Sequence, residues 1–446
     1  MNLLDKLVIP LSPEHIQLLH YISMLIFFLF VPFISMVLVG TLLSLIYKRK
    51  GFKQDNNIYI KFSKDLIETV TINKSMGIML GIVSLITSVL IYIQLFHGAN
   101  LITVEYLVWS FVFVTIGIIL IYTYRYSLSF SEIFNSLDES KEDESVAEEI
   151  RKYRTNSRKL SLKAGGFGIA FLIIGTWIFT AGVTLGFFTS KWNDTHLLSV
   201  LFSWAVIARY ITFLLLAAAF TGAAILFSFF YWEGGKENLN EEYKDFIRAN
   251  GIALTAIPAM ILPLFLLLDL TDLPGVTLSS SVFTFITLGV LLLFLGYHYL
   301  YLMYKNNNAD YSLHVFLVVL LTIFATIIAD QTAMVNANKP QTFALAQNFD
   351  NVMTKLTASS APPTISGEDI YKNICSACHS FDHKVVGPPY NQTLPTFHGD
   401  VDKLVDFILH PTHPIPGYPE MPNPGLTQPQ AHAVATYILQ EVKKYE

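Results

Sequence analysis

Two cysteines stand close together near the C-terminus, and a histidine directly follows the second of them. The segment reads Cys375-Ser376-Ala377-Cys378-His379, and the chain contains no other cysteine. Two thiols at this spacing lie on one helical turn, where each can bond to a vinyl group of a haem. The next residue then places an imidazole beside the iron. Because C-x-x-C-H is the pattern of c-type haem attachment, the sequence predicts one covalent haem c with His379 as an axial ligand.

A pair of cysteines with two residues between them also occurs in zinc sites and in thiol redox sites. A structural zinc site of this kind needs further cysteine or histidine ligands, and the chain has no second CxxC pair. The adjacent histidine and the predicted location outside the cytoplasm, derived below, also favour haem over zinc or disulfide chemistry.

A second axial ligand must come from the segment that follows His379. Met421 is the only methionine in that segment, and a thioether ligand raises the reduction potential of a haem relative to two imidazoles. With both axial positions filled by protein, no position remains open for a substrate, so we expect this region to carry electrons rather than to catalyse a reaction. The alternative ligands are the histidines His398, His410, His413 and His432.

Residues 366–446 resemble the class I cytochrome c family. In that family a glycine and an aromatic residue on the first helix pack against an aromatic residue on the last helix, and Gly367, Tyr371 and Tyr437 match these positions. The resemblance implies a small all-α domain that binds a single haem.

Two further segments carry this resemblance. Gly387-Pro388 resembles the loop whose proline carbonyl accepts a hydrogen bond from the proximal histidine, which implies that Pro388 orients the ring of His379. Met421 followed by proline, shortly before the last helix, is the family's pattern for the second ligand. That helix is expected to start near Thr427, a good N-cap, with Pro429 in its first turn.

The region that must hold this domain is a membrane region. The chain is 53% hydrophobic and only 14% charged, and a membrane span needs about 20 apolar residues. Segments of this kind end near residue 333, and the chain beyond them has the composition of a soluble domain. The predicted spans are residues 18–46, 75–97, 102–124, 164–189, 206–231, 250–270, 281–304 and 310–333.

The positions of Lys and Arg predict the orientation of these spans, because positive residues are enriched in cytoplasmic loops. Two connections are strongly basic, so we expect both in the cytoplasm and the N-terminus outside. After eight spans the chain returns to the outside, which is where c-type haems are attached. The basic residues are Lys48, Arg49, Lys50, Lys53, Lys61 and Lys64 after the first span, and Arg151, Lys152, Arg154, Arg158, Lys159 and Lys163 after the third.

The predicted architecture is therefore all-α, with an eight-span transmembrane helix bundle at 1–335, a linker at 336–365 and a cytochrome c domain at 366–446. The linker is expected to be helical to about Leu356. It then becomes an extended tether from Ala358 to Thr364, which spans at most about 25 Å.

Ionisable side chains within the spans are candidates for function, because they are costly to place in a bilayer. Imidazoles at equal depth can ligate haem b, which allows an outer pair, His20 with His97, and an inner pair, His298 with His314. Interfacial histidines with no ligand role are the alternative. For Glu105 and Arg209 we expect an ion pair, with a haem-propionate contact or a quinol or proton site as alternatives.

The first three spans resemble subunit I of the cytochrome bd quinol oxidases. The similarity lies in Phe28-Leu29-Phe30-Val31-Pro32, in Asn73, Gly77, Gly81, Gln94 and Gly98, and in Glu105, which matches one of two family acids. Where the family has two haem-binding histidines and a second acid, this chain has Phe27, Thr212 and Phe113. The resemblance therefore implies a related fold and leaves haem b, quinol oxidation and oxygen reduction by this chain open.

Together these features predict a multi-pass protein of a bacterial cytoplasmic membrane, with its haem domain on the outer, periplasmic side. We expect an electron-transfer subunit of a respiratory complex, an oxidoreductase only within that complex. Its expected partners are other membrane subunits, including a cytochrome bd-like one, and a soluble electron carrier or oxidase outside; nothing points to nucleic acid. The alternatives are a quinol:cytochrome c oxidoreductase, a degenerate oxidase subunit with additional haem b, and a simple membrane anchor.

Overall fold

The computed structural model describes residues 10–71, 73–99, 101–136, 144–192, 197–232, 235, 239–359, 366–411 and 415–445. The chain divides into two compact units, Met1–Asp350 and Asn351–Glu446. Within the described ranges the regular structure consists of helices, without a strand. The all-α prediction is therefore confirmed for this part of the chain.

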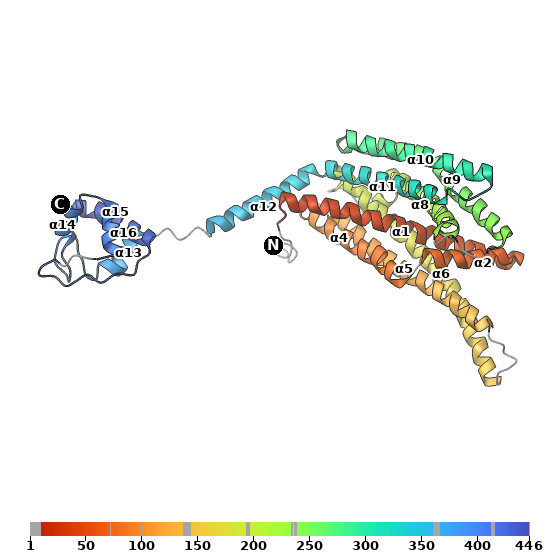
Figure 1. Cartoon of the computed structure of the whole chain (residues 1–446), viewed down its shortest axis with the longest axis horizontal. Coiled ribbons are helices and arrows are strands. Elements are labelled where there is room, and N and C mark those ends of the chain that lie inside the picture. Colours follow the sequence, from red (N-terminus) through yellow and green to blue (C-terminus); the bar gives the residue numbers. More distant parts are fainter. Residues whose placement is uncertain are drawn as a thin grey trace. The chain divides into compact units, whose positions relative to one another are not determined.

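The described part of the first unit contains eight long apolar helices, one for each predicted span, and each is long and apolar enough to cross a membrane. Figure 1 shows them running alongside one another. The chain is thus a multi-pass membrane protein. The helices are α1 (Pro13–Gln54), α3 (Lys74–Met76) continued by η2 (Gly77–Val83) and α4 (Ser84–Leu95), α5 (Leu101–Ser136), α6 (Glu144–Phe187), α8 (Trp204–Phe230), α9 (Glu241–Asp272), α10 (Ser280–Asn306) and α11 (Ser312–Ala337).

Several of these helices are longer than the predicted spans. Helix α1 has 42 residues and α6 has 44, which corresponds to about 60 Å each at 1.5 Å per residue. The hydrocarbon core of a bilayer is only about 30 Å thick. Both helices therefore continue beyond the apolar layer, and hydropathy alone marked only their apolar parts.

The connection after α1, which was expected to be a loop, contains the amphipathic helix α2 (Asn57–Val70). Asn56 caps its start by accepting hydrogen bonds from the backbone N–H groups of Ile58 and Tyr59. The buried side chains Phe62 and Leu66 lie one turn apart and pack into the core. A helix with one apolar face and one charged face suits the boundary between a bilayer and water.

The two basic segments lie at the same end of the bundle. The Lys48 ammonium donates a hydrogen bond to the Ser161 hydroxyl at 3.0 Å. The guanidinium of Arg158 lies 5.3 Å from the ring centre of Phe52. These contacts agree with the prediction that both segments lie on one side of the membrane.

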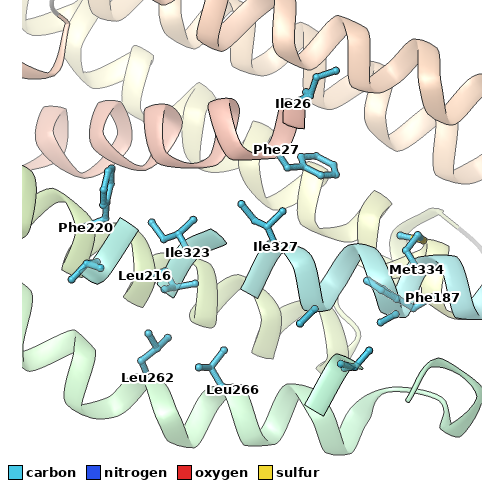
Figure 2. Close-up of a cluster of buried hydrophobic side chains, with 14 of the residues drawn as sticks. Ile26, Phe27, Phe187, Leu216, Phe220, Leu262, Leu266, Ile323, Ile327 and Met334 are labelled. Carbon is cyan, nitrogen blue, oxygen red and sulfur yellow. The ribbon is translucent and has the colours of Figure 1, made fainter. Parts of the chain in front are cut away.

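The core between the helices is apolar and closely packed. At Gly222 of α8, an added Cβ would lie 2.5 Å from Thr255 Oγ1 and 2.7 Å from Thr255 N on α9. Only glycine allows this approach, in the way that small residues commonly bring membrane helices together. Figure 2 shows part of the surrounding cluster, including Ile26, Phe27, Leu216, Phe220, Leu262, Leu266, Ile323 and Ile327.

Helix α12 (Lys339–Ser359) follows α11 and accounts for most of the predicted linker. The Asn338 side chain just before it donates to the Gly186 carbonyl oxygen at 3.1 Å, and Gln341 Nε2 donates to the His97 carbonyl oxygen at 3.0 Å. The helical prediction for this stretch is confirmed. Residues 360–365, most of the expected extended tether, lie outside the described residues.

The second unit is a small helical domain built around its last long helix, α16 (Gln428–Glu441). Thr427 caps α16: its backbone N–H and hydroxyl both donate to Gln430 Oε1 at 2.9 Å. The start near Thr427 and Pro429 in the first turn agree with the prediction. The other elements are α13 (Gly367–Ile370), η7 (Tyr371–Cys375), α14 (Tyr390–Thr393), η8 (Leu394–Phe397), α15 (Val401–Leu409) and η9 (Val442–Lys444).

Helices α13 and α16 meet at Gly367. A Cβ at this position would lie 2.2 Å from the Ala433 carbonyl oxygen and 2.8 Å from Tyr437 Cβ. The rings of Tyr371 and Tyr437 lie 5.8 Å apart, centre to centre. The predicted contact of Gly367 and Tyr371 with Tyr437 is therefore present, and it brings the first and last helices together next to the cysteines.

Candidate functional site

The cysteine pair lies on a single turn at the end of η7. The backbone N–H groups of Cys378 and His379 both donate to the Cys375 carbonyl oxygen, at 3.1 and 2.9 Å. The Cys378 carbonyl oxygen accepts from Val386 N and Gly387 N, which folds the following loop back onto the turn. Both cysteines are free and half-buried. Two thiols and an imidazole are thus presented from one short stretch of chain.

The ring of His379 is held in one orientation by a hydrogen bond. Its Nδ1 lies 3.0 Å from the Pro388 carbonyl oxygen. Because a carbonyl oxygen can only accept, Nδ1 carries the hydrogen and Nε2 keeps a free lone pair. This is the contact that the sequence resemblance implied for Pro388, and it leaves Nε2 available as a metal ligand.

Gly387 leaves the space that the imidazole occupies. A Cβ at this position would lie 2.4 Å from His379 Cε1 and 2.8 Å from its Nδ1. Any larger residue would push the ring away from Pro388. The glycine and the proline of this loop therefore act together, the first by making room and the second by fixing the orientation.

Tyr390 also belongs to this site, although no sequence motif had singled it out. Its ring stacks on the His379 imidazole, with 5.1 Å between centres and 9° between planes. Burial raises the pKa of Tyr390 well above its ordinary value, and burial also raises the pKa of the Cys375 thiol. Both groups are therefore protonated at neutral pH. Only its place two residues after Pro388 could have suggested Tyr390.

Met421 lies in the extended stretch before α16 and is half-buried. Asn423, two residues later, anchors this stretch, because its Nδ2 donates to the Leu409 carbonyl oxygen at 2.8 Å. The alternative ligands His398, His410 and His432 are exposed, and His413 lies outside the described residues. An exposed histidine is solvated, whereas the half-buried thioether lies on a tethered loop, so these positions favour Met421.

The residue types in this site suit a haem, which contains its own iron. Two thiols can form thioether bonds, one imidazole nitrogen is free to ligate, and the Met421 thioether is available on the stretch before α16. Across the ranges that the structure describes, no group of three or more His, Cys, Asp or Glu side chains is arranged to hold a bare metal ion.

Within the membrane unit, His20 lines a small pocket together with the polar side chains of Ser23, Tyr92, Gln331 and Asn338 and several apolar ones. His20 Nε2, Tyr92 Oη and Asn338 Oδ1 are buried without a hydrogen-bond partner. The pocket has a volume of about 10 Å³, which is close to that needed for one water molecule. A pocket of this size can hold one water molecule, whereas a haem is far too large for it.

The remaining intramembrane histidines lie in different settings. His97 is half-buried in the turn after α4. His298 and His314 are exposed, and both imidazoles contact the ring of Tyr299, with centres 6.0 and 5.2 Å away. A haem held by His298 and His314 would therefore lie on the outside of this unit rather than within it.

The expected ion pair between Glu105 and Arg209 is replaced by a different one. Arg209 Nη1 lies 3.2 Å from Asp330 Oδ1 of α11, and its guanidinium lies over the ring of Phe187. Glu105 is exposed near the start of α5. The expected partner was wrong because the sequence does not reveal which face of α11 meets α8.

Phe27 stands where the cytochrome bd family has a haem-binding histidine. Its side chain is buried, and the centre of its ring lies 5.6 Å from that of Phe179 and 6.4 Å from that of Tyr92. Aromatic side chains thus fill the space beside this position.

No protein-family model matches the chain, and no curated protein matches it in sequence.

Proposed function

We propose that this chain is a membrane-bound c-type cytochrome that passes single electrons as a subunit of a respiratory membrane complex. The observation that carries the proposal is the turn from Cys375 to His379, with the imidazole bonded to the Pro388 carbonyl oxygen at 3.0 Å. The close approach of α13 and α16 at Gly367 supports a class I cytochrome c domain around that turn.

Each residue of the site has a distinct role in this proposal. Cys375 and Cys378 would hold the haem covalently through thioether bonds. His379 Nε2 would ligate the iron, and Pro388 fixes the ring and makes it a stronger donor. Met421 would supply a second ligand to the iron. When bound, the haem supplies one-electron redox chemistry at its iron, and the two protein ligands exclude a substrate from it.

The membrane unit supports the proposed location. Eight apolar helices place the chain in a membrane, and the paired basic segments at one end of the bundle favour a cytoplasmic position for that end. On this topology the haem domain lies outside the cytoplasmic membrane of a bacterium. It would exchange electrons with a soluble carrier or oxidase there and with a membrane subunit, for which the resemblance suggests a cytochrome bd-like protein.

The decisive experiment is a pyridine haemochrome spectrum of the purified full-length chain, with haem and protein quantified together. We expect one haem c for each chain and a Met421→Ala variant that keeps the haem but has a lower reduction potential. A chain without covalent haem would contradict the proposal. Haem b together with haem c would favour the alternative of a quinol:cytochrome c oxidoreductase.

A further inference from the structure

A groove of about 830 Å³ lies on the surface of the membrane unit. Its walls come from α3 with η2, from the second half of α5, and from the part of α6 that precedes the fourth predicted span. The volume falls within the range of about 300–1,000 Å³ that is typical of ligand sites. Ile78, Ile119 and Leu160 line the groove, and each is at least half exposed, so the groove is open along its side.

The open side faces the bilayer along much of its length. Ile78 and Ile119 belong to apolar helical segments that are long enough to cross a membrane. The lining on α5 runs from Ile118 to Phe130, which corresponds to about 18 Å at 1.5 Å per residue. One leaflet contributes about 15 Å to the hydrocarbon core. A lipid of the surrounding leaflet can therefore enter the groove sideways, and an acyl chain can lie along it.

Two hydrogen bonds hold the walls of the groove together. Tyr122 Oη on α5 donates to the Asn73 carbonyl oxygen just before α3, and Arg125 Nη1 donates to the Thr71 carbonyl oxygen, both at 2.7 Å. Gly77 lets α5 come close, since an added Cβ would lie 2.5 Å from Tyr122 Cε2. Gly77 is also the first residue of the π-helix η2, a form that is frequent at functional sites. The groove is therefore preformed in the folded protein.

Positive charge collects at one part of the groove. The Lys74 ammonium lies 4.6 Å from the centre of the Tyr126 ring, and the Arg125 guanidinium lies 5.8 Å from it. Lys74 lines the groove, is exposed, and forms no ion pair with any residue in the described ranges. None of the described lining residues is acidic. An anion beside Lys74 would therefore be attracted by two cations and repelled by no carboxylate of these walls.

The cations lie at the end of the bundle that carries the two basic segments. Ser157, which also lines the groove, directly precedes Arg158 of the second basic segment. The Ser127 hydroxyl donates to the Ser157 carbonyl oxygen at 2.6 Å, which joins α5 to α6 there. Basic pockets between membrane helices on the cytoplasmic side bind the headgroups of anionic lipids. The groove combines such a basic part with an apolar part that reaches into the bilayer.

We propose that this groove binds one anionic phospholipid from the leaflet at that end of the bundle. The phosphate lies beside Lys74 and Arg125, and an acyl chain lies against Ile78, Ile119 and the apolar residues around them. The apolar wall would also admit a helix of another subunit, but an ammonium without a carboxylate partner among the described residues favours a phosphate. The proposal does not depend on haem binding by the second unit, so either can fail without the other.

The test titrates the full-length protein, purified in detergent, with dioleoyl phosphatidylglycerol and counts bound lipids by native mass spectrometry. The comparison lipid is dioleoyl phosphatidylcholine, which has the same acyl chains and a phosphate but no net charge. We expect one saturable phosphatidylglycerol for each chain. It should bind about tenfold more tightly than phosphatidylcholine, because each nearby cation favours an anionic lipid about fivefold. Equal affinities would overturn the proposal, since the groove would then be a non-selective apolar surface.

Two variants locate the site. Lys74→Gln removes the ammonium, and we expect about fivefold weaker binding of phosphatidylglycerol with unchanged binding of phosphatidylcholine. Ile119→Trp fills the apolar part of the groove and should abolish saturable binding. Because Ile119 is 56% exposed, this variant is expected to fold.

Each variant has a matched control outside the groove. Lys50→Gln removes an exposed ammonium at the same end of the bundle, which likewise lies over an aromatic ring, that of Tyr47. Ile257→Trp enlarges an isoleucine of α9 that is 61% exposed. Neither residue lines the groove, so we expect both controls to bind phosphatidylglycerol as the unmodified protein does.

Every outcome of the titrations bears on the proposal. Weaker binding in Lys74→Gln and Ile119→Trp, with unchanged binding in both controls, supports it. Equal weakening in Lys50→Gln would overturn it, because the lipid would then be attracted to the basic end as a whole. Saturable binding that neither groove variant changes would place the lipid elsewhere and overturn it. No saturable binding would also overturn it and would leave a helix of another subunit as the occupant.

Discussion

The two units of the chain present their chemistry in opposite ways. In the second unit, the thiols, the imidazole and the carbonyl that orients it all lie between Cys375 and Pro388, on one turn and the loop after it. In the first unit, Arg209 and Asp330 are 121 residues apart along the chain and meet only because α8 packs beside α11. A local site can be recognised in a sequence, whereas a site assembled from several helices cannot.

The largest expected effect is on the local site. A Cys375→Ser and Cys378→Ser double variant removes both thiols, and we expect covalent haem to fall from one for each chain to none. Haem staining after denaturing electrophoresis measures this directly. Ser376→Ala is the matched control, because its hydroxyl only bonds to the Lys372 carbonyl oxygen one turn earlier. Covalent haem in the double variant would contradict the assignment.

The ion pair between Arg209 and Asp330 in the membrane unit should respond unequally to the loss of one partner or the other. Arg209→Met leaves Asp330, Asp269 and Asp272 without a counter-charge. Because the pair with Asp330 is only partly buried, we expect a loss smaller than the cost of breaking a fully buried pair, which is about 3–5 kcal/mol. Asp330 is 44% exposed, and Arg209 keeps two other acids in Asp330→Asn, so we expect a loss of about 1 kcal/mol. Unfolding of the protein in nanodiscs, followed by circular dichroism, gives both values. Equal losses would show that Arg209 has no special place in the cluster.

A pair of glycine variants tests whether the units are stabilised independently. Gly367→Ala places a Cβ 2.2 Å from a carbonyl oxygen on α16 and Gly222→Ala places one 2.5 Å from Thr255 on α9. Overpacking of this kind costs about 1–3 kcal/mol. We expect Gly367→Ala to speed proteolysis only after residue 366 and Gly222→Ala only in the membrane unit. Gly166→Ala is the control, since no atom lies within 4 Å of its added Cβ.

The smallest expected effect concerns pH at the start of α13. The Lys372 ammonium hydrogen-bonds to Glu368 at 2.6 Å and lowers the pKa of that carboxyl group below 4.5. Because this pKa is lower in the folded state, the pair stabilises the folded state at pH values above the ordinary carboxyl pKa of 4.5. The stabilisation disappears as the pH falls through the lowered pKa. The hydrogen-exchange protection factors of the α13 amides, which are corrected for the intrinsic pH dependence of exchange, should therefore fall in acid. In Lys372→Met this acid-dependent change should be smaller; the same change in both proteins would exclude the pair as its cause.

The sequence predicted much of the fold, but not its contacts. All eight apolar segments correspond to helices, because about 20 consecutive apolar residues have few stable alternatives in a membrane. Hydropathy did not reveal α2, whose apolar residues recur at helical spacing within a polar stretch. Nor did it reveal the aqueous parts of α1 and α6, since those parts are helical without being apolar.

The sequence by itself determined the order of the membrane helices and singled out the candidate haem ligands, because each depends on residues that are close together in the chain. Only the tertiary structure decided that Arg209 pairs with Asp330 rather than Glu105 and that Tyr390 stacks on His379. It also decided that Thr184 and Arg209 line one cavity of the membrane unit. The physical reason is that side-chain partners are set by the rotation and depth of packed helices. A helix's own composition leaves both of these quantities undetermined.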